Sequence, residues 1–136
     1  MALKGKSMSL ELITPQIYSL LLCSRLDENR ATGGWVIEPF SEVGVPRLPV
    51  NLELTILAQI MAPPGDYGLG MRLYQADDPA NTLHVLPPRT ITVREDKNLD
   101  YVVATRLDVL RLGMYLLEAT LDGYETRRTL LRITPA

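Results

Sequence analysis

The sequence predicts an all-β protein, an antiparallel β-sandwich of seven to nine strands that forms one domain over residues 1–136, with residues 1–10 as a loose arm. Three observations support this fold class. Many short segments alternate apolar and polar side chains, the pattern of strands that bury one face. Ten prolines and nine glycines are scattered along the chain and separate these segments. A chain of 136 residues is also long enough to bury a core without a metal ion or a disulfide.

The first predicted segments follow in order. Residues 16–26, QIYSLLLCSRL, are apolar on both faces, which predicts a strand covered on both sides, although periodicity alone also allows a buried helical turn. After a polar turn, residues 35–43 form a strand that Pro39 places at a sheet edge or a bulge. Residues 44–51 contain two prolines and are expected to be extended, because a residue before proline avoids the helical region.

The middle of the chain carries the clearest strand. In residues 52–61, LELTILAQIM, every second side chain is apolar. Residues 67–74 return after a turn, and their two glycines on one face indicate a close backbone approach or a kink. Two short strands, 83–86 and 90–93, flank a pair of prolines.

Residues 99–110, LDYVVATRLDVL, allow two interpretations. A helix over this segment would have its apolar face interrupted by Arg106. A strand fits better, and a short helix here is the one exception that the sequence allows to an all-β fold. In a strand, one apolar face is formed by Leu99, Tyr101, Val103, Leu107 and Val109.

The dipeptide Asp122–Gly123 predicts a tight β-hairpin near the C-terminus. A two-residue type I′ turn requires positive φ at both central positions, which aspartate and glycine tolerate. In such a turn Leu121 pairs with Tyr124, and the strands run back along each other from there.

This register has a consequence for the returning strand. Glu118 would face Arg127, an ion pair that contributes about 0.2–1 kcal/mol. Strict alternation would also place Arg128 opposite Leu117, in the core. We therefore predict a β-bulge near Arg127–Arg128, which would return the later apolar residues of this strand to the inside.

The segment before the hairpin has the pattern of a tyrosine corner. Gly113 and Tyr115 follow two leucines at the expected start of a late strand, where the tyrosine hydroxyl would bond back to the main chain. This pattern resembles that of immunoglobulin-like sandwiches. Leu117 stands where antibody domains have a cysteine, so the resemblance is to cysteine-free members, and Tyr115 is expected to be structural.

Most of the chain beyond residue 15 also resembles a set of small uncharacterised bacterial proteins. The resemblance is carried by a strand ending near a cysteine in SLLLCSRL, a glycine turn, a proline-containing connection and the final G-x-Y…D-G hairpin in GMYLLEATLDGYE. It implies an immunoglobulin-like β-sandwich and brings no active-site residue with it.

Composition limits the classes of function. The 14 basic and 16 acidic residues are spread along the chain, without the basic cluster typical of nucleic-acid binding. A single cysteine, Cys23, excludes an internal disulfide and predicts a reducing compartment, the cytoplasm. With a single histidine, His84, it also excludes a zinc site of the usual cysteine–histidine kind within one chain. No apolar run reaches the roughly 18 residues of a membrane span. The apolar run 17–22 is also too short for the core of a signal peptide, about 7–15 residues, so no cleaved leader is expected.

Candidates for chemistry are few. His84 could act as a general base only with a positioned partner, and we expect it to be packed or solvated instead. Acidic residues in predicted turns allow a calcium site at one end of the sandwich, but capping of the turns is sufficient to explain them and is the interpretation we favour. These residues are Asp66, Asp77, Asp78, Glu95 and Asp96.

Trp35 is the single tryptophan. Together with Tyr67 and Tyr124, which lie near turns, it could line a sugar-binding surface. A single large aromatic residue more often fills the core or the mouth of a sandwich, and that is the position we expect for Trp35.

These observations predict a non-enzymatic protein-interaction or assembly domain that binds a protein partner or a second copy of itself and needs no cofactor. A calcium- or carbohydrate-binding module is the alternative, and a small enzyme with a carboxylate or tyrosine site is a third hypothesis. The residues singled out, all in structural roles, are Gly113, Tyr115, Asp122, Gly123 and Trp35.

Overall fold

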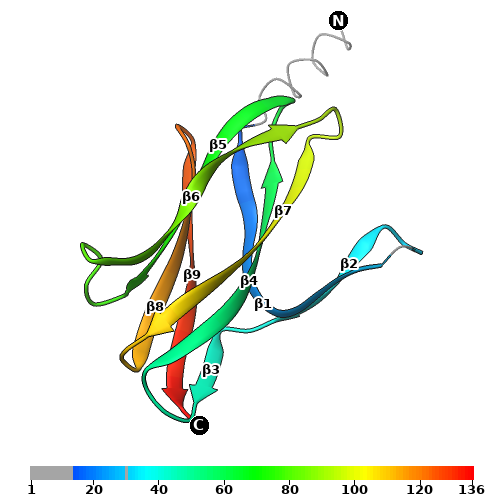
Figure 1. The fold of residues 1–136 in the computed structure, drawn as a ribbon. Helices are drawn as coiled ribbons and strands as arrows, with labels where there is room; N and C mark the ends of the chain where they lie inside the picture. Colours follow the sequence, from blue (N-terminus) through cyan, green and yellow to red (C-terminus); the bar gives the residue numbers. More distant parts are fainter. Residues whose placement is uncertain (1–13, 30) are drawn as a thin grey trace, which may run out of the picture.

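The computed structural model describes residues 14–29 and 31–136, and in them two β-sheets pack face to face (Figure 1). One sheet has the strand order β2-β1-β4-β7 and the other β3-β9-β8-β5-β6. The predicted all-β sandwich is confirmed. The strands are β1 (Gln16–Asn29), β2 (Gly34–Pro39), β3 (Glu42–Val45), β4 (Val50–Met61), β5 (Gly65–Gln75), β6 (Thr82–Val93), β7 (Asn98–Val109), β8 (Gly113–Leu121) and β9 (Glu125–Pro135).

The expected loose arm at residues 1–10 lies outside the described residues. Within the described part of the chain, no helix is long and apolar enough to cross a membrane. One pair of strands departs from the predicted antiparallel arrangement, because β3 and β9 run parallel. The predicted strand 35–43 is also divided, since β2 belongs to the four-stranded sheet and β3 to the five-stranded sheet.

The core lies between the two sheets and is built from alternate side chains of the central strands. On β4 these are the residues that the sequence pattern predicts, with Ile56 and Ile60 fully buried. The largest fully buried side chains are Tyr115, Ile17, Leu22, Ile56, Leu57, Ile60, Leu73, Leu107, Leu117, Leu121, Leu131 and Ile133.

The ambiguous segment near residue 100 is a strand. β7 pairs with β4 over twelve consecutive residue pairs, from Val50–Val109 to Met61–Asn98, with no irregularity. Its odd-numbered apolar residues face the core, and Leu107 and Val109 are buried there. The helical alternative is therefore wrong, and the period of two explains why Arg106 lies on the outer face.

The C-terminal hairpin has a longer loop than predicted. Leu121 pairs with Glu125, which leaves Asp122, Gly123 and Tyr124 in a three-residue loop. The amide of Tyr124 donates to the carbonyl of Leu121 at 3.0 Å. Gly123 has a φ of 78°, whereas Asp122 does not have a positive φ, so the predicted type I′ turn is wrong. A single glycine at this position is what a type II turn requires.

The additional loop residue also removes the need for a bulge. The ladder between β8 and β9 is uninterrupted, with Glu118 opposite Arg128 and Ala119 opposite Arg127. Because side chains alternate with a period of two, one extra residue in the loop reverses which face each β9 residue occupies. Leu131 is thereby placed in the core and Arg128 outside it. The predicted bulge near Arg127–Arg128 is wrong for this reason.

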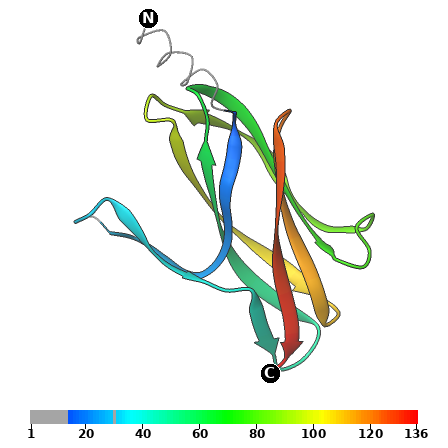
Figure 2. The same cartoon turned by 180° about the vertical axis from the view of Figure 1, so that it is seen from behind.

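The strand β1 bends in its middle and pairs with two different strands. Its first half pairs with β4 and its second half with β2, with a register shift between Cys23 and Arg25. The second half of β1 and β2 form a hairpin, here called the β1–β2 arm (residues 24–29 and 31–39), that leaves the body of the sandwich (Figure 2). Pro39 lies at the end of this edge strand, opposite Cys23.

The two glycines of β5 have different surroundings. A Cβ atom on Gly68 would lie 3.2 Å from the Cβ of Asp122, and the Asp122 amide donates to the Gly68 carbonyl at 2.8 Å. The predicted close approach therefore occurs at Gly68. A Cβ atom on Gly70 would meet nothing within 4 Å. Gly70 instead lies in a shallow depression on the outer face of the sheet, beside Pro88 and Thr120.

Candidate binding surface on the open side of the sandwich

The two long sides of the sandwich differ in how the sheets meet. On one side, here called the closed side, β1 contacts β9. The amide of Ile17 donates to Glu125 Oε1 at 2.7 Å, and Arg127 Nη1 donates to the Ile17 carbonyl at 3.0 Å. Two charged side chains of β9 therefore satisfy the main chain of β1 across the gap between the sheets.

On the other side, here called the open side, the edge strands β6 and β7 lie in different sheets and do not pair. A cavity of about 240 Å³ lies between them. It reaches apolar side chains of the core, and its rim carries polar side chains from both strands. The lining residues are Leu69, Met71, His84, Leu86, Pro87, Arg89, Tyr101, Val103, Ala104 and Thr105.

His84 spans this cavity. Its Nε2 lies 2.8 Å from Thr105 Oγ1, so one side-chain hydrogen bond links the two edge strands. A threonine hydroxyl next to a histidine supplies the nucleophile and the base of a nucleophilic catalytic site, but such a site also needs a third group that orients the histidine. Among the described residues, none forms a hydrogen bond with the other ring nitrogen of His84. The pair therefore acts as a bridge between the sheets.

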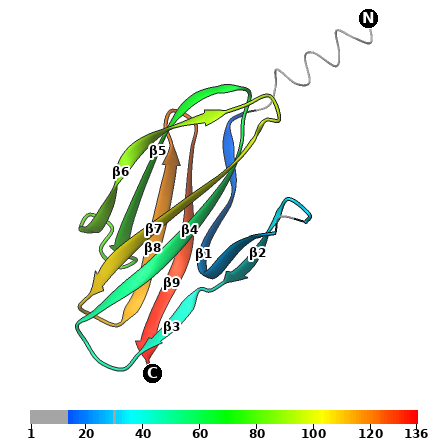
Figure 3. The same cartoon turned by 45° about the vertical axis from the view of Figure 1, so that its right-hand side comes forward.

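β7 lies at the edge of its sheet, beside β4 (Figure 3). The amide of Ala62 donates to the carbonyl of Lys97 at 3.1 Å, which fixes the phase of the ladder between the two strands. Because bonding alternates along an antiparallel pair, odd-numbered residues of β7 bond to β4 and even-numbered residues direct their N–H and C=O groups to the free edge. The residues at the free edge are Asn98, Asp100, Val102, Ala104, Arg106 and Asp108, and the side chain of each is exposed.

The neighbouring edge of β6 is less regular. Pro87 and Pro88 lack the N–H group, and the pairing of β6 with β5 shifts register there. Prolines and register shifts are features that prevent one sheet edge from pairing with another. β7 contains neither, so its free edge is the one that can accept a further strand.

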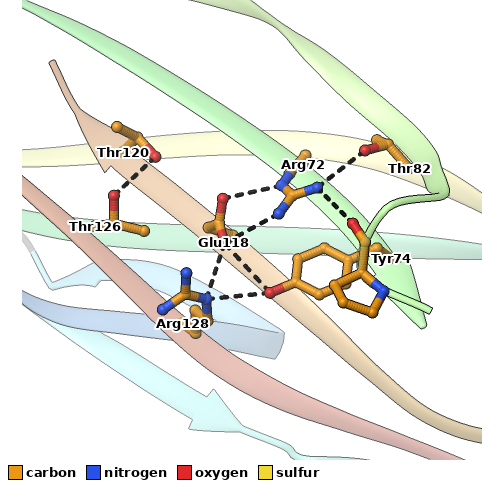
Figure 4. A network of polar contacts seen from close by, with 8 residues as sticks. Arg72, Tyr74, Thr82, Glu118, Thr120, Thr126 and Arg128 are labelled. Carbon is orange, nitrogen blue, oxygen red and sulfur yellow. Dashed lines mark hydrogen bonds and ion pairs between the residues drawn. The ribbon is translucent and has the colours of Figure 1, made fainter. Parts of the chain in front are cut away.

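The outer face of the five-stranded sheet carries a polar cluster centred on Glu118 (Figure 4). Arg72 Nε donates to Glu118 Oε1 at 2.9 Å, and Arg128 Nε donates to Oε2 at 2.8 Å. The hydroxyl of Tyr74 donates to Oε2 at 3.2 Å. Hydrogen bonds from Arg72 hold the pKa of the Glu118 carboxyl below its usual range, and the charge of Arg128 adds to this.

The same cluster also fastens the loop between β5 and β6. Arg72 Nη1 donates to the carbonyl of Pro79 at 2.9 Å and to Thr82 Oγ1 at 3.2 Å. Its guanidinium lies 4.2 Å from the centre of the Tyr74 ring, a cation–π contact. Glu118 is 9% exposed, and both of its oxygens accept hydrogen bonds. A carboxylate held in this way stabilises the sheet and is poorly placed to exchange protons.

The expected tyrosine-corner residues lie at the start of β8. The Tyr115 hydroxyl donates to the carbonyl of Arg111 at 2.5 Å, and the side chain is 1% exposed. Burial raises the pKa of this hydroxyl. Gly113 has a φ of 132°, which an L side chain rarely adopts. This is the geometry of a tyrosine corner, with the bond spanning four residues.

Trp35 does not lie in the core, so its expected position is wrong. It is half-buried on the β1–β2 arm, and its Nε1 donates to Asp100 Oδ2 at 2.7 Å. The arm therefore passes over the outer face of the four-stranded sheet, where Leu57 is fully buried although its neighbours Ile56 and Ala58 face the core. An indole N–H that leaves water needs an acceptor, and Asp100 supplies it.

The other candidate groups are dispersed. Tyr67 and Tyr124 stack edge to face on the five-stranded sheet, with ring centres 5.7 Å apart, and Trp35 is on the arm of the other sheet. Over residues 14–29 and 31–136, the acidic residues of the turns form no group of three or more metal-ligating side chains. Asp66 instead accepts a hydrogen bond from Thr92 Oγ1 at 2.7 Å.

Asp100 and Arg106 are functional candidates that sequence reasoning missed. Asp100 accepts hydrogen bonds from Trp35 and from Gln59 Nε2, and Arg106 Nη2 donates to Glu53 Oε1 at 2.9 Å. Both residues alternate with apolar ones in the sequence, which is the signal of an outward face. Nothing in that pattern indicates that the strand is at an edge.

Known proteins share the fold of this chain but not its sequence. No protein-family model matches the chain, and no curated protein sequence is similar to it. A β-glucosidase from Erythrobacter marinus superposes with a TM-score of 0.50 and 9% identity, over 89% of this chain and 15% of that chain. A β-glucosidase from Listeria innocua matches with a TM-score of 0.43 and 9% identity, over 85% of this chain and 16% of that chain. The chain thus spans about 15% of the length of the first of these enzymes, and the likeness is one of fold alone.

Proposed function

We propose that this chain is a protein-interaction or assembly domain that binds its partner by β-strand addition at the free edge of β7. The observation that carries the proposal is the regularity of that edge. It extends from Asn98 to Asp108 without a proline or a bulge, and over residues 14–29 and 31–136 no strand lies beside its outward backbone groups. An added strand gains a hydrogen bond at each of these groups.

The cavity of the open side supports a role for side chains as well. A strand added to β7 would direct alternate side chains towards the cavity, beside Val103 and Met71. In strand addition, main-chain bonds supply affinity and pockets for alternate side chains supply specificity. The rim residues His84 and Arg89 would then select the polar groups of the partner.

The substitution Ala104→Pro tests this proposal. Residue 104 directs its N–H to the free edge, so proline there removes an edge donor and no bond to β4. Ala104→Val is the matched control, because it keeps the N–H group. Each protein is immobilised, exposed to a cell lysate and to further copies of itself, and the retained proteins are quantified by mass spectrometry.

We expect proteins retained by the native chain to be retained by Ala104→Val and lost from Ala104→Pro. Circular dichroism and thermal melting establish that each variant is folded. Equal retention by folded Ala104→Pro would show that the free edge of β7 is not the binding surface.

A further inference from the structure

We infer that the strand added to β7 is the β7 strand of a second copy of this chain, antiparallel and related by a two-fold axis at Val103. This inference rests on the proposed function and names its partner. It makes the protein a dimer with one continuous sheet across both copies. Three features of β7 support it: the phase of its backbone bonds, the order of its charges and the apolar row on its inner face.

The phase of the backbone limits how two β7 strands can pair. Only even-numbered residues offer N–H and C=O groups at the free edge, so each hydrogen-bonded pair must join two even-numbered residues. The two-fold axis then passes through a single residue, which lies opposite its own copy. Two such registers make use of almost the whole strand. One is centred on Val103 and pairs Asn98 with Asp108, and the other is centred on Ala104 and pairs Leu99 with Val109.

Charge distinguishes these two registers. Centred on Val103, the pairing places Asp100 opposite Arg106 of the other copy, and symmetry repeats this pair once more. Centred on Ala104, it places Asp100 opposite Asp108 of the other copy, again twice. Opposite charges directly across a sheet are stabilising and like charges are destabilising. Of the two registers, only the one centred on Val103 therefore places the charges of the outward residues of β7 opposite complementary charges.

The inner face agrees with the same register. Leu99 then lies opposite Leu107 of the second copy, and Val103 lies opposite its own equivalent. Tyr101 lies opposite Thr105, and both residues line the cavity of the open side. Each copy would thus extend the apolar row of the other and cover part of its cavity. Side chains of the second copy complete the lining that one copy leaves open.

Both charged side chains lie on the outer face of β7 and already bond to neighbours within one copy. Asp100 is held by Trp35 and Gln59, and the side chain of Arg106 is 69% exposed while it bonds to Glu53. An arginine has five N–H donors, so the bond to Glu53 leaves donors for a second carboxylate. The β1–β2 arm, through Trp35, therefore fixes one half of the charge pair.

Charge reversal followed by mixing tests the register. Asp100→Arg gives two positive residues at these positions in each copy, and Arg106→Asp gives two negative ones. Each variant alone would then place like charges opposite each other in the dimer, whereas a 1:1 mixture would restore two opposite pairs. Sedimentation equilibrium measures the association of the native chain, of each variant and of the mixture.

We expect the native chain to dimerise, each variant alone to associate at least tenfold more weakly, and the mixture to recover heterodimers. A mixture as weakly associated as the variants alone would overturn the inference, as would variants that dimerise like the native chain. Asp100→Arg removes the acceptor of Trp35, so the fold of each variant is measured by circular dichroism.

A cysteine test does not depend on these charges. In the inferred register Val103 is opposite its own copy, in a pair without backbone bonds, so Val103→Cys should form an intermolecular disulfide under mild oxidation. Thr105→Cys on the same face lies four residues from its copy along the strand and should remain reduced. The unmodified chain is the background control, because Cys23 is 3% exposed. Cross-linking of Ala104→Cys in preference to Val103→Cys would show the other register.

The two proposals fail in different ways. If the native chain is monomeric at all concentrations, self-pairing is ruled out. If the Ala104→Pro variant of that chain nevertheless fails to retain another protein that the native chain retains, strand addition at β7 still holds. A folded Ala104→Pro variant that neither loses retained proteins nor changes its association rules out both.

Discussion

The closed and open sides of the sandwich join the same two sheets by different means. On the closed side, Glu125 and Arg127 reach across from β9 and bond to both main-chain groups of Ile17. On the open side, the bond between His84 and Thr105 joins two side chains. The first arrangement satisfies backbone groups of β1, whereas the second leaves those of β7 directed outward.

The difference indicates that stability and binding are separated in this fold. Ile17 is fully buried at the closed side. Val103, at the open side, is partly buried and lines the cavity. A region that is to accept another strand must leave its edge unpaired, and unpaired edges contribute less to stability.

The same substitution on the two sides should have unequal costs. Leu131→Ala on β9 removes a fully buried side chain and is expected to lower the free energy of unfolding by about 3 kcal/mol. Leu99→Ala on β7 removes a partly buried side chain beside the open side, so we expect a loss of about 1 kcal/mol. Urea denaturation of both variants at a concentration where the protein is monomeric measures the difference. Equal losses would contradict the separation of stability from binding.

Ion pairs provide a second comparison, between the buried Glu118 and the exposed Glu53 beside β7. Glu118→Gln is expected to destabilise the protein by about 2 kcal/mol at neutral pH, because two arginines lose their carboxylate; loss of one partner of a fully buried pair costs about 3–5 kcal/mol. Glu53→Gln weakens a pair whose side chains are 69% and 76% exposed, and should cost less than about 0.5 kcal/mol.

The pH dependence sharpens this comparison. The folded-state pKa of Glu118 is lowered, chiefly by hydrogen bonds from Arg72. Its contribution to stability is therefore present above the unfolded-state pKa of about 4.3 and is lost as the pH falls through the folded-state pKa. The gap in unfolding free energy between the native chain and Glu118→Gln should narrow in acid. A gap of constant size from neutral pH to about pH 3 would show that the ionised form of Glu118 is not what the arginines stabilise.

Local patterns in the sequence predict much of this fold. The alternation of apolar residues identifies β4 and β7, and the glycine after Asp122 identifies the reversal between β8 and β9. These features depend on neighbouring residues alone. The length of the hairpin loop does not, because a two-residue and a three-residue loop differ in which β9 side chains reach the core. The burial of Leu131 decides between the two loop lengths, and this burial exists only once both sheets have packed together.

The candidate surface could not be predicted for a related reason. The outward residues of β7 have the pattern of any half-buried strand, and its place at the edge follows from the order of strands in the sheet. Trp35 shows the same limit. Its hydrophobicity predicts the core, but the bend of β1 at Cys23 carries it onto an arm whose acceptor, Asp100, is 65 residues away in the sequence.

The smallest expected effect concerns the bridge across the open side. Thr105→Val removes the hydrogen bond to His84 and keeps the shape of the side chain. We expect a loss of less than about 0.5 kcal/mol, because His84 is only partly buried and water can replace the threonine hydroxyl. Arg127→Met on the closed side leaves the carbonyl of Ile17 without its donor and should cost about 1 kcal/mol. Chemical denaturation of the two variants in parallel measures the order. If Thr105→Val cost more than Arg127→Met, the bond between His84 and Thr105 would be a main link between the two sheets. An added strand would then have to break that bond before it could pair with β7.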